Sequence, residues 1–240
     1  MKTTISENGP GLSVDSVWKY YGDFPALRDI KLKIEPGSTV ALLGRNGAGK
    51  TTLLRIIAGL AKASEGGVRI DNADVREEST RRRIGILGHS ISLYDELSAQ
   101  ENLTLFARLY GLAEPEKKAL AWLERTGLDR VRDGLVREFS RGMRQRLAVA
   151  RAFIHEPDVL IFDEPFTALD DRAIEVLQSL LADAHASGRT VILSTHQLRE
   201  ALEIATHVAM IQRGQLVFAG ARTEQMVDDT SFLYKTYGEN

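Results

Sequence analysis

One short stretch constrains the fold more than any other part of this 240-residue chain. The segment GRNGAGKT, from Gly44 to Thr51, follows the apolar run VALL and precedes TLLRIIAGL, whose apolar spacing is typical of a helix. This order matches the motif G-x-x-x-x-G-K-[ST], in which glycines let backbone N–H groups surround phosphate oxygens at a helix N-terminus. We therefore expect a phosphate-binding loop between a buried strand and a helix. The alternative is a merely flexible glycine turn.

Two carboxylates follow another apolar run, in the segment VLIFDE. Asp163 is expected at the carboxyl end of a buried strand, where it can hold Mg²⁺ through water, and the Thr51 hydroxyl can ligate the same ion. Glu164 lies one residue further and can orient or deprotonate an attacking water, while Lys50 supplies positive charge to the β- and γ-phosphates. This set favours nucleotide hydrolysis over binding alone. The alternative is an acidic strand end before a turn at Pro165.

Continuous apolar runs indicate the main sheet. The segments TVALLG, VLIFDE, TVILSTH and HVAMIQ are apolar at nearly every position, which is typical of strands covered on both faces in a parallel α/β sheet. Nearer the N-terminus, LSVDSVWKYYG and LRDIKLKIEPGS mix apolar with polar residues and end in turn signals. That pattern predicts short strands in an antiparallel sheet beside the main core.

A largely helical block lies before VLIFDE, at about residues 98–155. Its start contains Ser98-x-x-Glu101, the pattern of a capping box, in which each side chain satisfies a backbone N–H group of the first turn. Glycines and a proline divide the first part of the block into two helices, and a third helix is expected to begin near Ser140.

These signals predict one α/β domain over residues 1–240: a P-loop NTPase core with a mainly parallel sheet, an N-terminal antiparallel β subdomain and an inserted α-helical subdomain. We expect the core and the β subdomain at about 12–89 and 156–220. The helical subdomain is expected at about 90–155. Residues 221–240 form a tail for which the sequence gives no structural expectation.

Composition restricts the partners and the compartment. The chain has 31 Lys and Arg residues against 33 Asp and Glu residues, so no global positive field favours nucleic acid, and we expect no direct nucleic-acid partner. The local cluster Arg81 to Arg83 is read as a solvated turn rather than a nucleic-acid patch. Without cysteine, neither disulfides nor thiolate metal sites can support the fold. The absence of an apolar run near 20 residues predicts a cytoplasmic protein that reaches membranes only through a partner.

A third motif resembles a known family. The segment FSRGMRQRLAVARAF resembles the signature of ATP-binding cassette (ABC) ATPases, whose usual form is L-S-G-G-Q at a helix start. It lies just upstream of VLIFDEPFTALD, as in that family, and STH follows after one helix and one strand. The resemblance covers nearly the whole chain. It implies ATP and Mg²⁺ as cofactors and a homodimer that encloses two ATP molecules head to tail.

The resemblance also implies roles for individual residues. Tyr21 would stack on adenine, Glu164 would act as the catalytic base and His196 would contact the γ-phosphate. The alternative for Tyr21 is an ordinary strand aromatic, and the alternative for His196 is a core histidine. Thr51 and Asp163 would hold the metal. The residues implied to bind ATP are Tyr21, Gly44, Asn46, Gly47, Ala48, Gly49, Lys50, Thr51, Thr52, Ser140, Gly142 and Asp170.

The chain departs from the family pattern at several positions. Arg141 and Met143 replace a glycine and the glutamine of the usual signature, although Ser140 and Gly142 remain. At the end of IGIL, where the family has a glutamine near Mg²⁺ and the attacking water, this chain has His89. We expect His89 to take part in catalysis as the nucleotide-sensing residue of this loop. A stray histidine at a strand end is the alternative.

The implied function is an ATPase subunit that drives an exporter through an integral membrane permease subunit. Within the family, the segments LGHSISLYDELSAQENLTLFARLYGL and FSRGMRQRLAVARAF are most similar to the ATP-binding subunit of the bacterial haem exporter of cytochrome c maturation. ATPases of drug or polysaccharide exporters share much of the pattern, and a soluble ABC ATPase without a transport role is a further alternative. Leu93 and Tyr94 are expected either to anchor a helix of the permease or to pack the loop against its own lobe.

Overall fold

The computed structural model describes residues 11–88, 92–167 and 169–237. The strands of this part of the chain are β1 (Leu12–Tyr21), β2 (Phe24–Ile34), β3 (Thr39–Leu43), β4 (Glu65–Ile70), β5 (Ala73–Asp74), β6 (Ile84–Leu87), β7 (Val159–Asp163), β8 (Thr190–Ser194), β9 (His207–Gln212) and β10 (Gln215–Ala221). The helices are α1 (Lys50–Ile57), α2 (Glu78–Arg81), α3 (Ala99–Leu109), α4 (Pro115–Arg125), α5 (Arg141–Phe153), α6 (Asp171–Ala186), α7 (Leu198–Ile204), α8 (Glu224–Asp228) and α9 (Phe232–Tyr237), with 3-10 turns η1 (Asp129–Val131) and η2 (Val136–Glu138).

Within the described residues, the main sheet has six strands in the order β10-β9-β3-β8-β7-β6. The four pairs from β9 to β6 are parallel, and only the edge pair β10 with β9 is antiparallel. All residues of β3, β7 and β8 are buried, because both faces of the sheet are covered. The mainly parallel sheet predicted from the continuous apolar runs is confirmed.

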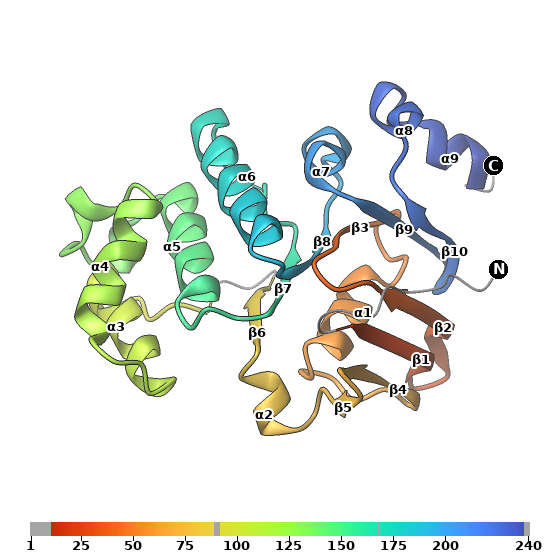
Figure 1. The fold of residues 1–240 in the computed structure, drawn as a ribbon, viewed down its shortest axis with the longest axis horizontal. Helices are drawn as coiled ribbons and strands as arrows, with labels where there is room; N and C mark the ends of the chain where they lie inside the picture. The colour runs from red at the N-terminus through yellow and green to blue at the C-terminus, as the bar shows by residue number, and fades with distance from the viewer. Residues whose placement is uncertain (1–10, 89–91, 168, 238–240) are drawn as a thin grey trace.

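Successive residues of one strand join two different cores, as the pleat requires. Leu160 and Phe162 of β7 pack in the core formed with α5 and α6, whereas Val159 and Ile161 pack in the core formed with α1 and the antiparallel sheet. Figure 1 shows α6 and α7 on one side of the main sheet and α1 on the other. The phosphate-binding candidates thus lie where β3 leaves a sheet that is packed on both sides.

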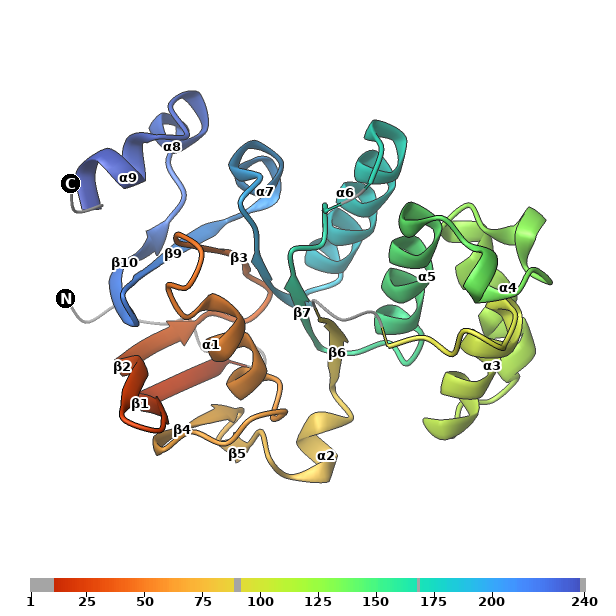
Figure 2. The same ribbon diagram turned by 180° about the vertical axis from the view of Figure 1, so that it is seen from behind.

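The antiparallel sheet has the order β2-β1-β4-β5 and lies beside α1 (Figures 1 and 2). Its existence was predicted, but its strands were expected to be short, and β1 and β2 have 10 and 11 residues. Bulges at Val14/Val17 and Val17/Lys19 shift the pairing of β1 with β2. These bulges let Leu12, Val14 and Val17 all bury their side chains, although simple alternation would not place them on one face.

Helices α3, α4 and α5 form a group at the opposite end of the molecule from the antiparallel sheet (Figures 1 and 2). The predicted capping box is confirmed: the Glu101 N–H donates to Ser98 Oγ at 3.2 Å, and the Ser98 N–H donates to Glu101 Oε2 at 2.8 Å. The third helix begins at Arg141, one residue after the expected Ser140. The two earlier helices are also present where the sequence predicts them.

The residues after Gly220 carry structure that the sequence did not indicate. Strand β10 continues to Ala221, and α8 and α9 follow it. Leu233 of α9 is buried, and the ring of Tyr237 lies 4.8 Å from that of Phe218 on β10. The end of the described chain therefore packs back onto the edge of the main sheet.

The basic cluster before β6 is tied into the fold rather than fully solvated. Arg83 donates to Asp158 Oδ2 at 2.6 Å and to Asp71 Oδ2 at 2.7 Å, and its side chain is only 33% exposed. Arg82 pairs with Glu78 on the surface of α2. The described residues contain no helix that is both long and apolar enough to cross a membrane; the longest, α6, has 16 residues.

Candidate active site

The loop between β3 and α1 needs glycine for steric reasons. Gly44 has a φ of 152°, and a Cβ atom there would lie 2.4 Å from the carbonyl oxygen of Ile211. Gly49 has a φ of 111°, and a Cβ atom there would lie 2.9 Å from the carbonyl oxygen of Ala26. Any other residue would clash with backbone at both positions. The glycines of the motif therefore let neighbouring strands approach the loop, in addition to freeing its N–H groups.

Lys50 is the first residue of α1, and its side chain folds back over this loop. Residue Lys50 is only 7% exposed, and its Nζ donates to the carbonyl oxygen of Gly44 at 2.8 Å. A buried ammonium group beside backbone N–H groups at a helix N-terminus creates a local positive potential. This part of the site therefore favours an anion of phosphate geometry.

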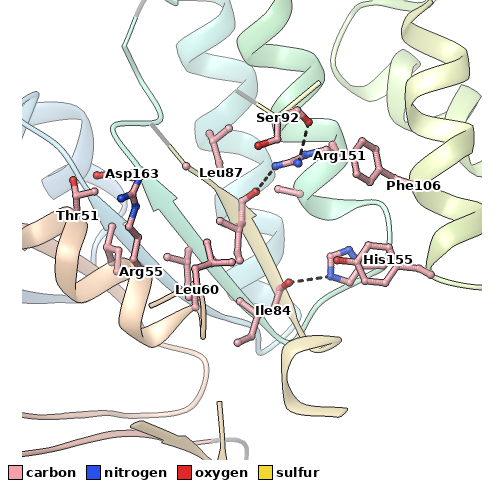
Figure 3. A pocket seen from close by; sticks show the side chains of 17 residues that line it. Thr51, Arg55, Leu60, Ile84, Leu87, Ser92, Phe106, Arg151, His155 and Asp163 are labelled. Carbon is pink, nitrogen blue, oxygen red and sulfur yellow. Dashed lines mark hydrogen bonds between the residues drawn. The ribbon is translucent and has the colours of Figure 1, made fainter. Parts of the chain in front are cut away.

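Asp163 and Thr51 supply oxygen atoms to one cavity of about 250 Å³. Figure 3 shows their side chains at the same end of this cavity, Thr51 from α1 and Asp163 from the end of β7. Asp163 is 6% exposed and accepts a hydrogen bond from Ser194 Oγ at 2.5 Å, because β7 and β8 pair these two residues directly. A hydroxyl and a carboxylate are the hard oxygen donors that suit Mg²⁺ held together with phosphates.

Glu164 and His196 form a close pair at the carboxyl ends of β7 and β8. The Oε2 atom of Glu164 accepts a hydrogen bond from the His196 N–H at 3.2 Å and lies 2.8 Å from its Nδ1. The Glu164 side chain is 17% exposed and that of His196 is 62% exposed. A carboxylate oriented by an imidazole in this way has the geometry of a general base and its orienting partner.

A second cavity, of about 370 Å³, joins the phosphate loop to Glu164. Most of the predicted ATP-binding residues line it. These are Tyr21, Asn46, Gly47, Ala48, Gly49, Lys50, Thr51 and Thr52. One further lining residue is Phe24, which pairs with Tyr21 across the β1–β2 turn and is 65% exposed.

Sequence reasoning missed Phe24. The only signal in the sequence was an aromatic residue three positions after Tyr21. In the structure the Tyr21 residue is 52% exposed. Lys19 Nζ lies 5.1 Å from the centroid of the Tyr21 ring. The hairpin turn thus offers two aromatic faces beside the phosphate loop, a surface on which a planar base can stack.

The structure does not bring Ser140, Gly142 and Asp170 to this cavity. Ser140 is the N-cap of α5, and its Oγ accepts from the Met143 N–H at 3.2 Å. Asp170 is the N-cap of α6, and its Oδ1 accepts from the Ala173 N–H at 2.8 Å. Both N-cap residues are exposed. Within one chain they act as helix caps, and an ATP-binding role for them requires a second chain.

The predicted residue His89 lies outside the described residues. The segments on either side of residues 89–91 are joined by Arg151 of α5, which donates to the carbonyl oxygens of Ile86 at 3.0 Å and Ser92 at 3.1 Å (Figure 3). Burial lowers the pKa of Arg151, and its guanidinium lies 5.1 Å from the Phe106 ring centroid. Sequence patterns gave no sign of this contact, because Ser92 and Ile86 lie 59 and 65 positions before Arg151 in the sequence.

Leu93 and Tyr94, for which the sequence left the same two alternatives open, differ in exposure. Leu93 is partly buried and packs against the main core, as the intramolecular alternative requires. Tyr94 is 52% exposed, and its ring lies 6.0 Å from that of Phe106. Its backbone is fixed by Asn102, which accepts from the Tyr94 N–H at 2.8 Å and donates to its carbonyl at 2.9 Å. Tyr94 therefore presents a fixed aromatic surface to solvent.

Comparison with known proteins gives one consistent family. The family model described as ABC transporter matches residues 27–167. The ABC transporter ATP-binding protein NatA of Bacillus subtilis is 40% identical over 201 residues, which are 82% of each chain. A Nod factor export ATP-binding protein of Cupriavidus metallidurans is 35% identical over 90% of this chain and 73% of its own. The daunorubicin resistance ATP-binding protein DrrA3 of Streptomyces coeruleorubidus is 37% identical over 89% and 69%.

Solved structures agree with this result. An ATP-binding cassette captured as a dimer in a post-hydrolysis state with ADP and phosphate has a TM-score of 0.82 and 30% identity, and the match covers 88% of this chain and 99% of that chain. An ATP-binding subunit of an ABC transporter has a TM-score of 0.83 and 30% identity over 95% of both chains. The phosphate loop, the paired carboxylates and the helical group thus occur in the fold that these proteins share, and the chain belongs to the ABC transporter ATP-binding family.

Proposed function

We propose that this chain binds and hydrolyses ATP in the presence of Mg²⁺ as the ATPase subunit of an ABC exporter. The observation that carries the proposal is the cavity of about 370 Å³, which has the phosphate loop on one side and Glu164 on another. Glu164 is in turn oriented by His196. A site built only to bind a nucleotide would not need the pair of Glu164 and His196.

The residues fit the substrate and the metal. The loop N–H groups and Lys50 bind the phosphates, and Tyr21 with Phe24 offers stacking surface for the base. Thr51 and Asp163 would hold Mg²⁺, which supplies charge stabilisation to the phosphates when bound. Ser194 keeps the Asp163 carboxylate in one orientation through its hydrogen bond.

The chemical step assigned to this chain's residues is proton removal from the attacking water. The Oε1 atom of Glu164 can accept this proton while Oε2 stays bound to His196. Such a base contributes roughly 10²- to 10⁴-fold to the rate. His89 is proposed to contact the same water in place of the family's usual glutamine, a proposal that rests on the sequence alone.

Two copies of the chain are proposed to form the working unit. Ser140, Gly142 and Asp170 lie away from the cavity of their own chain, on exposed helix starts that can approach the nucleotide of a partner. The N-terminus of α5 would then add N–H groups and its dipole to the γ-phosphate. The related cassette solved as a dimer with ADP and phosphate supports this arrangement.

The membrane partner is proposed to bind beside α3. Leu60, Tyr94 and Leu109 are 64%, 52% and 63% exposed, and Leu60 lines the cavity of about 250 Å³ together with Phe106 and Tyr110. A short cytoplasmic helix of a permease can insert apolar side chains into such a surface. Through this contact the chain would lie at the cytoplasmic side of the membrane.

For the cargo, the sequence resemblance favours haem exported for cytochrome c maturation. The support is the signature Ser140 to Met143 and the presence of His89. The relatives reported above are named for Nod factor export and daunorubicin resistance, so they favour the alternative of a drug or polysaccharide exporter over a haem exporter. Deletion of the gene in its host, followed by measurement of covalent haem in c-type cytochromes, distinguishes these cargoes.

The activity itself is tested by phosphate release from ATP. We expect hydrolysis by the wild-type chain with Mg²⁺, none with EDTA, and a large loss in Lys50→Ala because this variant removes the buried cation from the loop. A matched control is Lys62→Ala, which removes a lysine outside the cavity. Hydrolysis by Lys50→Ala at the wild-type rate would contradict the proposed site.

A further inference from the structure

The turn after β7 holds Glu164 in a backbone conformation that its neighbours in sequence disfavour. Glu164 has a φ of 57°, in the left-handed region that residues with side chains rarely adopt. The next residue is Pro165, and a proline shifts the residue before it toward extended conformations. This conformation therefore persists only because surrounding groups hold the turn in place.

Among the described residues, three of the hydrogen bonds at this turn come from three parts of the chain. The Glu164 N–H donates to the Ser194 carbonyl at 2.9 Å, and the Thr167 N–H donates to the Glu164 carbonyl at 3.3 Å. The side chain of Gln145 supplies the third, because its Nε2 donates to the Pro165 carbonyl at 3.0 Å. The Gln145 bond connects helix α5 to the residue that follows Glu164.

Gln145 is a polar residue at a buried position of α5. It is 7% exposed, and the following residues Leu147, Ala148 and Val149 are all buried apolar residues. An amide removed from water must be hydrogen-bonded to avoid a large cost in free energy, and an apolar residue of similar size would avoid that cost altogether. The bond to Pro165 gives this amide a role that an apolar residue could not perform.

We propose that Gln145 is a positioning residue for the Glu164 carboxylate, so that hydrolysis depends on the placement of α5. The inference rests on the proposed function of Glu164. Helix α5 starts after Ser140, the residue proposed to reach the partner's nucleotide, and Gln145 lies five positions later, about 7.5 Å along the helix axis. Contact of Ser140 with the partner's nucleotide thus fixes a helix that is bonded to the turn of Glu164 in the same chain.

The test uses two substitutions at adjacent positions of α5 in the full chain. Gln145→Met keeps a similar side-chain volume but removes the donor to Pro165. Arg146→Met is the matched control, since Arg146 donates to the carbonyls of Thr126 and Gly127, far from the turn in the sequence. We expect Gln145→Met to lower kcat about tenfold or more with little change in KM for ATP, because small displacements of a reacting group cost this much. Arg146→Met should keep kcat within about twofold.

A double-mutant cycle with Glu164→Gln separates positioning from general damage, and single-turnover hydrolysis is its readout. If Gln145 acts through Glu164, Gln145→Met should cause no further loss in the Glu164→Gln background. Equal kcat in Gln145→Met and wild type overturns the proposal. A further loss of rate on adding Gln145→Met to Glu164→Gln also overturns it. Both results leave the proposed function intact. If Glu164→Gln itself hydrolyses ATP at the wild-type rate, the role of Glu164 fails first, and the role of Gln145 fails with it.

Discussion

Lowering the pH from 7.5 to 5 should destabilise this protein through one histidine, His155, which lies two residues after the end of α5. Burial lowers the pKa of His155 from its ordinary 6.5 to about 4; the nearby Arg151 acts in the same direction, and the hydrogen bond to the Ile84 carbonyl opposes it. Its ring also stacks on Tyr110 with centroids 3.8 Å apart. Protonation thus requires a buried imidazolium beside an arginine.

The size of the effect follows from the two pKa values. The unfolded chain binds a proton at His155 below about pH 6.5, whereas the folded chain does so only below about pH 4, so stability falls as the pH drops through this window. At pH 5 the linkage relation gives a loss of about 2 kcal/mol relative to pH 7.5. Stopping at pH 5 keeps the ordinary titration range of Asp and Glu largely out of the measurement.

The assay is urea unfolding of the wild type and of His155→Phe at both pH values. Phenylalanine keeps a ring against Tyr110 but cannot titrate, so the variant should lose about 2 kcal/mol less than the wild type between the two pH values. Because each protein is compared with itself, the loss of the bond to Ile84 in the variant does not affect the comparison. An equal pH dependence in the two proteins would refute this reasoning.

Three further predictions concern the partners of this chain. Mixing the inactive variants Ser140→Ala and Lys50→Ala should restore part of the ATP hydrolysis, because one of the two composite sites in a mixed dimer is intact; the absence of any recovery under dimerising conditions would argue against action of Ser140 across the dimer. Tyr94→Glu should release the protein from membranes that contain its permease while its melting temperature changes little, because Tyr94 is 52% exposed. Leu93→Glu should in addition lower the melting temperature, since Leu93 packs against the core. Membrane fractionation and calorimetry test the Tyr94 and Leu93 variants. Membrane binding by Tyr94→Glu at the wild-type level would contradict the proposal that the permease binds the surface around Leu60.

The sequence predicts the parts of the fold and of the site that depend on local chemistry. The glycines of the phosphate loop, the capping box at Ser98 and the apolar strand before Asp163 each leave a short-range pattern, and each is present in the structure. Local patterns carry this information because the backbone conformation of a tight loop or a helix start depends on a few adjacent residues.

The remaining features depend on contacts between distant residues, which no local pattern encodes. Ser194 reaches Asp163 because two parallel strands pair in one register, and Gln145 reaches Pro165 because α5 packs against the end of β7. Phe24 lies at the site because a hairpin turn places it opposite Tyr21. Side chains of this kind look like ordinary surface or helix residues until the tertiary fold brings their partners near.

The central claim is that Glu164 removes the proton from the attacking water inside a closed dimer. Sedimentation of Glu164→Gln with ATP and Mg²⁺, combined with phosphate release, tests this claim most directly. The amide can still accept from the His196 N–H, so nucleotide binding should persist. We predict a stable ATP-bound dimer and a rate roughly 10² to 10⁴ times lower than that of the wild type. A Glu164→Gln protein that stays monomeric with ATP and hydrolyses it at the wild-type rate would contradict the account.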